Sequence, residues 1–331
     1  MPRRRSVVLA ALALVAGPAV APAAEAPPRR SLLRVAYAAP SGSPIHAGLL
    51  HFKEVLERTA RGRAEVQLVP GALEGDEGAI LAGLRRGAVQ VATLSGEAGL
   101  GPAARIASLP FLFRDAGHRR RVAEGPAGRL WARRIAEQAS LAVVGFFAAP
   151  DQVMATAARP IARPADLRGL RLRIGVHPLV LEGLRSLGAQ PVPLPAPLTL
   201  AAARQRMVAG AQVDLTSALA LQLYEVFPYM SQPATPWLAE VCLVLADRRS
   251  LAALPPDLQQ AVAAAMQEAA RQEFEVAEEA TGQAARDLQS RGARFGALDQ
   301  LAFQEAFGPF QETVGQRLEV QDLLAEIGRT R

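Results

Sequence analysis

The sequence predicts an α/β fold with two domains, braced by one long helix. Three observations support this prediction. In the first third of the chain, short apolar stretches alternate with amphipathic stretches of helical period, which is the pattern of a parallel sheet covered by helices. The same alternation returns in the second half. Near the end, Leu258 to Gln289 contains no proline and one glycine, so a helix of more than roughly 40 Å is expected there.

The composition is that of a soluble globular protein with room for two cores. The chain has 331 residues, of which 50% are hydrophobic and 21% charged, and single domains commonly hold about 100–200 residues. The net charge of +6 falls to +3 without the first 24 residues, which carry three arginines and no acid. Since no basic patch interleaved with aromatic residues is present, no nucleic-acid partner is expected. The single cysteine, Cys242, supports neither a disulfide framework nor a cysteine-based metal site.

The first 24 residues predict a secretory signal peptide. Arg3 to Arg5 form a basic start, Ser6 to Ala16 an apolar core, and Ala21-Pro22-Ala23 a cleavage pattern. The apolar core is shorter than the roughly 18 residues that cross a membrane. We therefore expect an exported protein, which would be periplasmic in a bacterium with two membranes. The alternative is an uncleaved anchor helix.

The first half of the mature chain begins with a β-α-β-α-β pattern. The expected strands are 32–38, 64–69, 88–94, 141–147 and 151–156. The expected helices are 45–60, 76–86 and 116–138, the last with a break at Gly125-Pro126. Open α/β sheets bind ligands at the carboxyl ends of their strands. Polar residues in the loops after the first two strands are therefore candidates to face a cleft: Ser41, Ser43, His46, Glu74 and Asp76. For His46 the alternative is that it satisfies local backbone groups.

One segment, Ile161 to Gly175, carries the main candidate for ligand binding. From Leu170 to Ile174 apolar residues alternate with Arg171 and Arg173, which predicts a half-buried strand. An arginine near the end of such a strand lies where α/β folds place ligands, and a guanidinium can hold a carboxylate by two parallel hydrogen bonds. We expect Arg173 to bind an organic anion. The alternative is that both arginines are solvated or paired with surface acids.

The remaining elements complete a second domain. We expect helices at 178–187 and 200–208, a proline-rich connector at 188–197, strands at 212–216 and 241–246, a short strand within 292–296, and a C-terminal helix from Gln300 that Gly308-Pro309 kinks or interrupts. The predicted division is a signal peptide at 1–24, a first α/β domain at 31–150 with 238–275, and a second at 151–237 with 276–331.

Motifs of catalysis and cofactor binding were sought in the sequence. It contains no phosphate-binding G-x-x-x-x-G-K-[ST], no G-x-G-x-x-G after a strand, no G-x-S-x-G and no H-E-x-x-H. We therefore predict a protein that is not an enzyme and that uses neither cofactor nor metal.

Taken together, the segments resemble those of a known family. Their order and spacing are similar to the periplasmic solute-binding proteins of tripartite ATP-independent periplasmic (TRAP) transporters, from residue 33 to residue 295. The segments that carry the resemblance are LRVAYAAPSGSPIHAG from Leu33, Arg61-Gly62-Arg63, Pro70-Gly71, Gly87 to Gln90, SLPFLF from Ser108, RPIARPADLRGLRLRI from Arg159, Leu187 to Ala189, Asp214, LYEVFPYM from Leu223 and LPPDLQQAV from Leu254.

The resemblance implies a fold, a site and partners. The fold would be the two-domain periplasmic-binding-protein type (type II-like), with hinge strands and a long helix that spans both domains. The arginine that closes the family's D-L-x-G-x-x-x-R segment forms the main salt bridge to the ligand carboxylate, and here that residue is Arg173. With the cleft candidates, the expected ligand-binding set is Arg173, Gln152, Asp214, His46, Glu74 and Gln90. The partners would be a small and a large membrane subunit of a TRAP permease.

The chain also departs from the family pattern. Gln152 aligns with a second arginine that the family often carries, Leu215 stands at the glycine of the family's D-G-x-E-N stretch, and Ser217-Ala218 stand at its Glu-Asn pair. Because these changes remove polar groups from the expected site, the sequence favours a ligand with one carboxylate and an apolar body over a ligand with a second acid.

The function expected from the sequence is capture of an organic acid by domain closure and its delivery to a TRAP permease. The alternative is a ligand sensor of the same fold that presents its closed form to a signalling partner. A monomer is expected. The apolar stripe of Phe303, Phe307 and Phe310 leaves a dimer through the C-terminal helix as the other reading of that segment.

Overall fold

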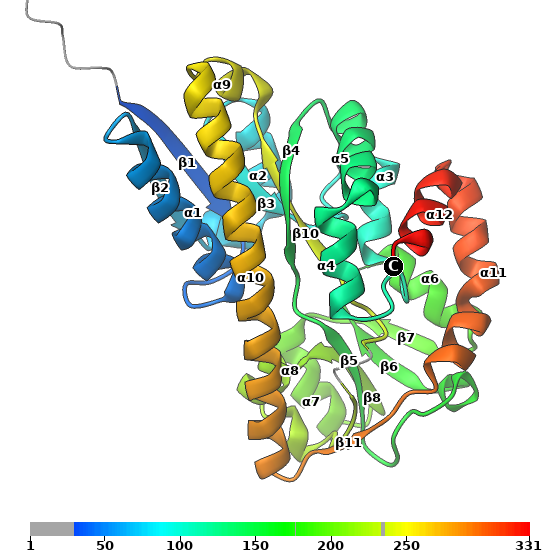
Figure 1. Ribbon diagram of the computed structural model, residues 1–331. Coiled ribbons are helices and arrows are strands. Elements are labelled where there is room, and N and C mark those ends of the chain that lie inside the picture. The colour runs from blue at the N-terminus through cyan, green and yellow to red at the C-terminus, as the bar shows by residue number, and fades with distance from the viewer. Residues whose placement is uncertain (1–29, 176, 233–235) are drawn as a thin grey trace, which may run out of the picture.

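The structure, a computed structural model, describes residues 30–175, 177–232 and 236–331, so the predicted signal peptide lies outside it. Two separate sheets organise the chain, one above the other in Figure 1. The first has the strand order β2-β1-β3-β10-β4 and the second the order β11-β9-β5-β8-β6-β7. We call each sheet with the helices on its two faces a lobe. The predicted α/β class with two sheets is confirmed.

The first lobe is built on a mixed sheet. Its strands are β1 (Ser31–Tyr37), β2 (Ala64–Pro70) and β3 (Val91–Leu94), which are parallel, and β10 (Val241–Ala246), which is antiparallel to β3 and to β4 (Ala142–Ala148). One face packs on α1 (Pro44–Ala60) and the start of α10. The other packs on α2 (Glu77–Arg85), α3 (Pro102–Arg105), α4 (Ala116–Glu124) and α5 (Pro126–Ala139). The short α9 (Arg248–Ala252) follows β10.

The second lobe has shorter strands. They are β5 (Gln152–Thr156), β6 (Arg171–Ile174), β7 (Gln190–Pro193), β8 (Gly210–Asp214), β9 (Tyr229–Ser231) and β11 (Arg294–Gly296). One face packs on α7 (Thr199–Arg204), α8 (Leu215–Ala220) and the end of α10, and the other on α6 (Pro178–Ser186) and α11 (Gln300–Leu318). The 3-10 turns are η1 (Ala72–Gly75), η2 (Ile106–Ser108), η3 (Pro164–Leu167), η4 (Ala196–Leu198) and η5 (Leu223–Glu225).

Two sequence predictions about proline were wrong. The proline-rich segment 188–197 was expected to be a connector, but it contains β7, which pairs with β6 alone at the edge of the sheet. An edge strand tolerates proline because one side of its backbone needs no sheet hydrogen bonds. Gly308-Pro309 was expected to kink or interrupt the C-terminal helix; the interruption is contradicted, because α11 continues through Pro309. The carbonyl of Pro309 instead accepts a hydrogen bond from Thr313 Oγ1 at 2.8 Å.

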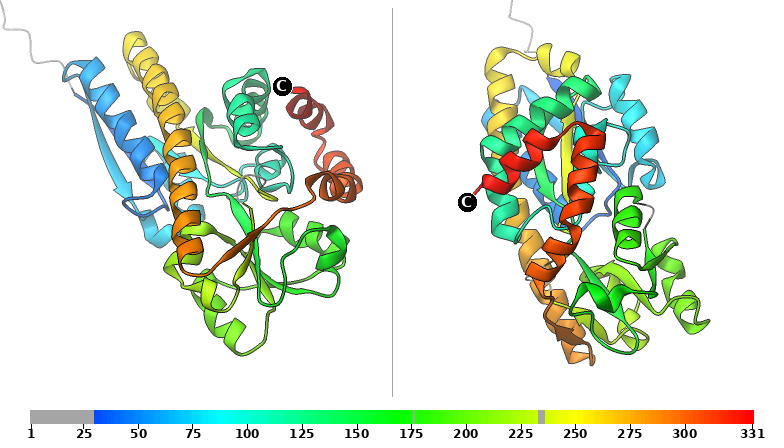
Figure 2. Two further views of the ribbon diagram at one scale, coloured as in Figure 1. Left: turned by 60° about the horizontal axis from the view of Figure 1, so that its bottom comes forward. Right: turned by 90° about the vertical axis from the view of Figure 1, so that its right-hand side faces the viewer.

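The predicted bracing helix is confirmed as α10 (Pro256–Ser290), 35 residues long. It runs down the side of both lobes in Figures 1 and 2, packing on α1 in the first and on α8 in the second. Its buried face contributes Met266 to the core of the first lobe and Leu288 to that of the second. None of the described helices is both long and apolar enough to cross a membrane.

The C-terminal helices tie the two lobes together on the side away from α1 (Figure 2). Phe303 and Phe307 of α11 belong to the core of the second lobe. Leu323 and Ile327 of α12 (Gln321–Arg329) belong to the core of the first, where α12 packs on α5. The domain division expected from the sequence, which places α12 in the second domain, remains a proposal. Because α12 packs on the first lobe, we propose that it belongs to the first domain.

Two extended segments cross between the lobes, and one arginine holds both. Arg119 of α4 is buried; its Nη1 donates to the carbonyls of Ala149 and Glu240, at 3.3 and 3.2 Å, and to Asp151 Oδ1 at 2.5 Å. Ala149 and Asp151 lie in one crossing segment and Glu240 in the other. The guanidinium also lies over the ring of Phe274 on α10, 5.8 Å from its centre.

A buried carboxyl group joins α10 to the same crossing. Glu273 Oε2 accepts a hydrogen bond from the Ala148 amide at 2.6 Å, and its other oxygen has no partner among the described residues. Burial raises the pKa of Glu273 to about 8, although the Ala148 hydrogen bond and the charge of Arg119 oppose the rise. The side chain is therefore protonated at neutral pH in the folded protein.

Replacing Gly48 by alanine is expected to destabilise the protein by about 1–3 kcal/mol, since added atoms in a packed contact force neighbours apart. Helices α1 and α10 meet at this glycine, and a Cβ there would lie 2.6 Å from Glu273 Cβ and 3.2 Å from Phe147 Cε2. Gly282→Ala is the matched control, because a Cβ there meets only Arg286 Nη1 at 3.6 Å. The control should gain about 0.5–1 kcal/mol from helix propensity. Denaturant unfolding measures both, and equal stability of the two variants would contradict the close contact.

Glu273→Gln should remove a pH dependence of stability. In the unfolded chain a glutamate ionises near ~4.3, and in the folded protein near 8. The folded state therefore binds the extra proton between these values. Its stabilisation is complete below the lower pKa and is lost as the pH rises through 8. The full effect is on the order of 5 kcal/mol at ~1.4 kcal/mol per pKa unit. Thermal unfolding of both proteins from pH 4.5 to 9 should show wild type losing stability relative to the variant; parallel curves would exclude a raised pKa.

Candidate ligand-binding cleft

The short strand β6 buries the candidate arginine inside the second lobe. The two flanking residues, Leu172 and Ile174, enter the hydrophobic core, as the alternation predicts. The two arginines differ, however. Arg171 is exposed and donates to the Arg206 carbonyl at 2.9 Å, whereas Arg173 is only 6% exposed. Arg173 is paired with Val192 of β7 and with Ala211 of β8, whereas Arg171, at the start of the strand, is paired with Gln190 of β7.

The guanidinium of Arg173 is held by backbone carbonyls. Its Nε donates to the Leu194 carbonyl at 2.8 Å and its Nη1 to the Gln212 carbonyl at 3.0 Å. No described carboxylate lies within ion-pair distance of it. Burial lowers the pKa of Arg173, and the negative charge of Asp214 opposes that shift. A guanidinium remains charged in proteins, so the site holds a desolvated cation whose Nη2 hydrogen bonds are available to a ligand.

Gln152, Gln212 and Asp214 meet at the same edge of the second sheet. Gln152 starts β5 and lies opposite Asp214, the last residue of β8. Gln212 Nε2 donates to Gln152 Oε1 at 3.3 Å, while the buried Oε1 of Gln212 has no partner among the described residues. Asp214 caps α8 by accepting from the Ser217 amide at 2.8 Å. The structure thus brings these three polar side chains to one sheet edge, but the carboxylate of Asp214 is also used to cap α8.

A cleft of about 480 Å³ opens between the lobes at this edge. The lining residues come from the loop after β1, the first crossing segment, the start of α8 and α10: Ala39 to Ile45, Ala148, Pro150, Asp214, Thr216, Ser217, Ala277, Ala280 and Thr281. Asp214 reaches this space directly, whereas Arg173 lies on the next strand of the sheet. Both Ser41 and Ser43, predicted from the loop after β1, line the cleft.

The other predicted site residues are placed differently. The ring of His46, at the start of α1, shares a 2.6 Å hydrogen bond with the buried hydroxyl of Tyr37, next to the cleft loop. Gln90 accepts from the Arg34 amide and donates to the Gly87 carbonyl, both at 2.9 Å. Because it precedes β3, it lies at the amino end of that strand, away from the cleft, and we exclude it from the site. Glu74 belongs to η1, and its side chain lies outside the described part of the structure.

The structure adds polar atoms that sequence reasoning missed. Among the described residues, further buried atoms without a hydrogen-bond partner include Glu97 Oε1, shortly after β3, His177 Nδ1, shortly after β6, and Thr199 Oγ1, at the start of α7. A buried polar atom left unpaired costs about 1–3 kcal/mol. None of these three residues lines the cleft described above. The only signal in the sequence was their position after a strand, which many polar residues share.

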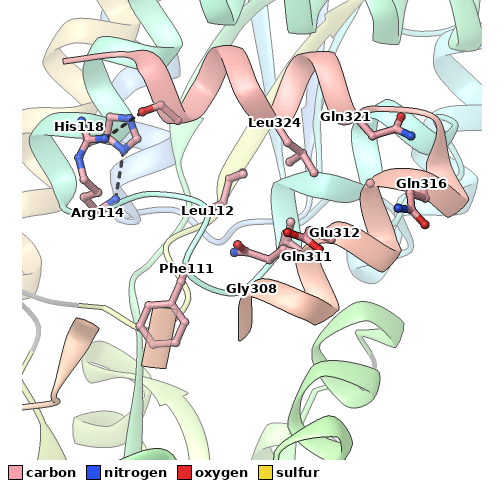
Figure 3. A pocket seen from close by; sticks show the side chains of 13 residues that line it. Phe111, Leu112, Arg114, His118, Gly308, Gln311, Glu312, Gln316, Gln321 and Leu324 are labelled. Carbon is pink, nitrogen blue, oxygen red and sulfur yellow. Dashed lines mark hydrogen bonds between the residues drawn. The ribbon is translucent and has the colours of Figure 1, made fainter. Parts of the chain in front are cut away.

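A second cavity, of about 410 Å³, lies between α11, α12 and the segment around Phe111 and Arg114 (Figure 3). Its charged and ionisable groups mostly form hydrogen bonds to backbone atoms of the protein. His118 accepts from the Arg114 amide at 3.1 Å and bonds the Ile327 carbonyl at 3.0 Å through its two ring nitrogens. The guanidinium of Arg114 donates to the carbonyls of Gly328 and Thr330. This cavity is therefore a weaker candidate for an anion than the cleft between the lobes.

Known proteins share both the sequence pattern and the fold. The chain is 25% identical over 280 residues to the 2,3-diketo-L-gulonate-binding periplasmic protein YiaO of Escherichia coli K12, covering 83% of this chain and 84% of that protein. Two solved TRAP periplasmic solute-binding proteins have the same fold. The one from Ochrobactrum anthropi has a TM-score of 0.84 and 22% identity, covering 91% of this chain and 96% of that one.

The second is the protein from Chromohalobacter salexigens with bound D-glucuronate. It has a TM-score of 0.79 and 23% identity, and covers 90% of this chain and all of that one (100%). The two-domain periplasmic-binding fold expected from the resemblance is thereby confirmed. The family model described as bacterial extracellular solute-binding protein, family 7 (DctP), matches residues 35–316, and the chain therefore belongs to that family.

Proposed function

We propose that this protein captures an organic acid in the cleft between its lobes, with Arg173 binding the carboxylate. One observation carries the proposal: a guanidinium only 6% exposed has carbonyl oxygens as its hydrogen-bond partners, with no described carboxylate in ion-pair contact. The two carbonyls fix its plane before a ligand arrives. A carboxylate would then receive charge-assisted hydrogen bonds from an oriented fork.

Closure of the lobes strengthens this contact. Closure would bring together the sheet edges on either side of the crossing segments and exclude water from around Arg173. An ion pair is stronger where the effective dielectric constant is low. The ligand's charge thus gives the closed form its advantage over the open one.

The proposed ligand has a polar body. The sequence favoured a ligand with one carboxylate and an apolar body, because Gln152 and Ser217-Ala218 stand where the family carries an arginine and a Glu-Asn pair. The structure supplies other polar atoms near the strand ends, on Gln212, Glu97 and His177. Relatives of this chain bind 2,3-diketo-L-gulonate and D-glucuronate, both of which carry one carboxylate and several hydroxyls. We therefore propose a hydroxylated monocarboxylic acid.

The proposed role is binding and delivery without chemical turnover. The chain would be exported through the signal peptide at 1–24, act in the periplasm, and present its closed form to the small and large membrane subunits of a TRAP permease. Membership of a solute-binding family and structural similarity to TRAP solute-binding proteins support this role.

Arg173→Ala should abolish tight binding of acids while the protein stays folded. Truncating one partner of a buried ion pair costs about 2–5 kcal/mol, which is roughly 30- to 5,000-fold in Kd. Arg173→Lys should recover only part of the loss, because lysine keeps the charge without the fork. Calorimetric titration with D-glucuronate and a panel of mono- and dicarboxylates measures the effect.

Arg171→Ala is the matched control, since Arg171 lies on the same strand but is exposed. It should bind as wild type does. If Arg173→Ala binds an acid with wild-type affinity, the proposed role of Arg173 is wrong. If wild type binds no acid of the panel, with native mass spectrometry showing no ligand retained from purification, the proposed function is wrong.

A further inference from the structure

Two polar side chains line opposite walls of the cleft between the lobes. Ser41 lies in the loop after β1, on the first lobe, and Asp214 ends β8, on the second. Alanine, proline, glycine and isoleucine make up most of the remaining lining, and Asp214 is the one charged residue among those described there. In a pocket of this kind, a few placed polar groups orient the bound molecule.

The carboxylate of Asp214 is fixed in orientation, and one of its oxygens is free. Its Oδ1 accepts hydrogen bonds from the Ser217 amide at 2.8 Å and from the Thr216 hydroxyl at 2.5 Å. Its Oδ2 has no hydrogen-bond partner in the described part of the structure. An ionised carboxylate only accepts hydrogen bonds, so Oδ2 can bind a hydroxyl group but cannot pair with the carboxylate of a ligand.

A tight turn holds Ser41 on the facing wall. The Ser43 amide donates to the Pro40 carbonyl at 3.3 Å, and Gly42 has a φ of +88°, at the position where a type II turn requires glycine. The Ser41 side chain is exposed, and no residue that the structure describes bonds its hydroxyl. A serine hydroxyl both donates and accepts, so it can bind a ligand hydroxyl in either direction.

Asp214 also has a defined position relative to Arg173. The Arg173 Nη1 donates to the Gln212 carbonyl at 3.0 Å, and Asp214 is two residues further along the same strand. Two residues of a strand span roughly 7 Å. A small sugar acid whose carboxylate is bound by Arg173 can therefore extend its hydroxylated end toward Asp214.

We propose that Asp214 and Ser41 bind hydroxyl groups of the ligand from opposite walls of the cleft, and that the protein therefore selects sugar acids over deoxy acids of the same shape. This inference rests on the proposed function, since it assumes that Arg173 holds the carboxylate. One ligand hydroxyl donates to Asp214 Oδ2, and another forms a hydrogen bond with Ser41 Oγ. Because the two residues belong to different lobes, a ligand bonded to both favours the closed form.

The selectivity follows from what an analogue without hydroxyls leaves behind. Such a molecule could still pair with Arg173, but on closure it would take water away from Asp214 Oδ2 without replacing its hydrogen bonds. A charged acceptor left unpaired is costly. Sites built to hydrogen-bond a hydroxyl reject analogues that lack it by as much as roughly 10⁴-fold. Ser41 is neutral and exposed, so its share of the selectivity is the smaller one.

The test compares two ligands of one shape. D-glucuronate and tetrahydropyran-2-carboxylate share a six-membered ring and one carboxylate, and the second has no hydroxyl; D-erythronate and butanoate form an acyclic pair. Calorimetric titration gives the affinity of wild type, Asp214→Ser, Ser41→Ala and the double variant for all four. Serine can still cap α8, and Asp214→Asn, which keeps both the cap and the shape, is measured as well.

Wild type should prefer the hydroxylated member of at least one pair by about 100-fold or more. Asp214→Ser should reduce affinity for that member about tenfold or more, and Ser41→Ala about threefold to tenfold. Neither should change affinity for the deoxy partner by more than about threefold. The two losses should multiply in the double variant, because each residue binds its own hydroxyl. Asp214→Asn should lose less than Asp214→Ser, since its amide can donate to the hydroxyl.

Asp299→Ser is the matched control. Asp299 caps α11 in the second lobe by accepting from the Ala302 amide at 3.2 Å, as Asp214 caps α8, but it does not line the cleft. This variant should bind all four acids as wild type does. A control that loses affinity as Asp214→Ser does would assign the loss to the missing cap and overturn the inference.

Three further results would overturn it. The Asp214 and Ser41 variants could weaken both members of a pair equally, which would indicate a general role in closure. Wild type could bind both members equally while Arg173→Ala binds neither, which would leave the proposed function intact and this inference wrong. Wild type could bind none of the four acids, which would also overturn this inference; the wider carboxylate panel then decides whether the proposed function fails with it.

Discussion

The architecture depends on how the chain is held where it passes between the two sheets. Arg119 contacts both crossing segments, through the carbonyls of Ala149 and Glu240 and the carboxylate of Asp151. Glu273 attaches α10 to the same place through the Ala148 amide. Removing one partner of a buried ion pair leaves an uncompensated charge, at a cost of about 3–5 kcal/mol. The crossing is therefore fixed at one point, while the sheet edges on either side remain free to approach each other.

Several polar groups of the second lobe lack partners that a protein at its stability optimum would supply. Arg173 bonds to backbone carbonyls, and Gln212 Oε1 has no hydrogen-bond partner among the described residues. In our proposal the carboxylate of the ligand supplies the missing charged partner of Arg173. The free energy of the interactions that the ligand completes then favours the closed form.

The sequence predicted the elements with clear periodicity and missed those that depend on neighbours. Strict alternation around Arg173 gave β6, and 32 residues without proline gave α10. The strand β7 was missed because Pro191 and Pro193 argue against a strand, and nothing local shows that this one lies at a sheet edge. Among the site residues, Gln90 was placed in the cleft on resemblance alone. Its side chain instead joins Arg34 of β1 to Gly87, in the turn before β3.

The sequence by itself determined the class of the fold and the family, and it predicted Arg173 as a ligand-binding residue, because each depends on patterns within one segment or on the order of segments. The tertiary structure decided which arginine of β6 is buried: Arg173 pairs with Val192 of β7 and Ala211 of β8, whereas Arg171, at the start of the strand, pairs with Gln190 of β7. It also decided that Arg119 contacts both Ala149 and Glu240, which lie far apart in the chain, so no spacing in the chain records their proximity. Contacts between lobes arise only when both sheets have formed and the crossing segments have set their edges opposite each other.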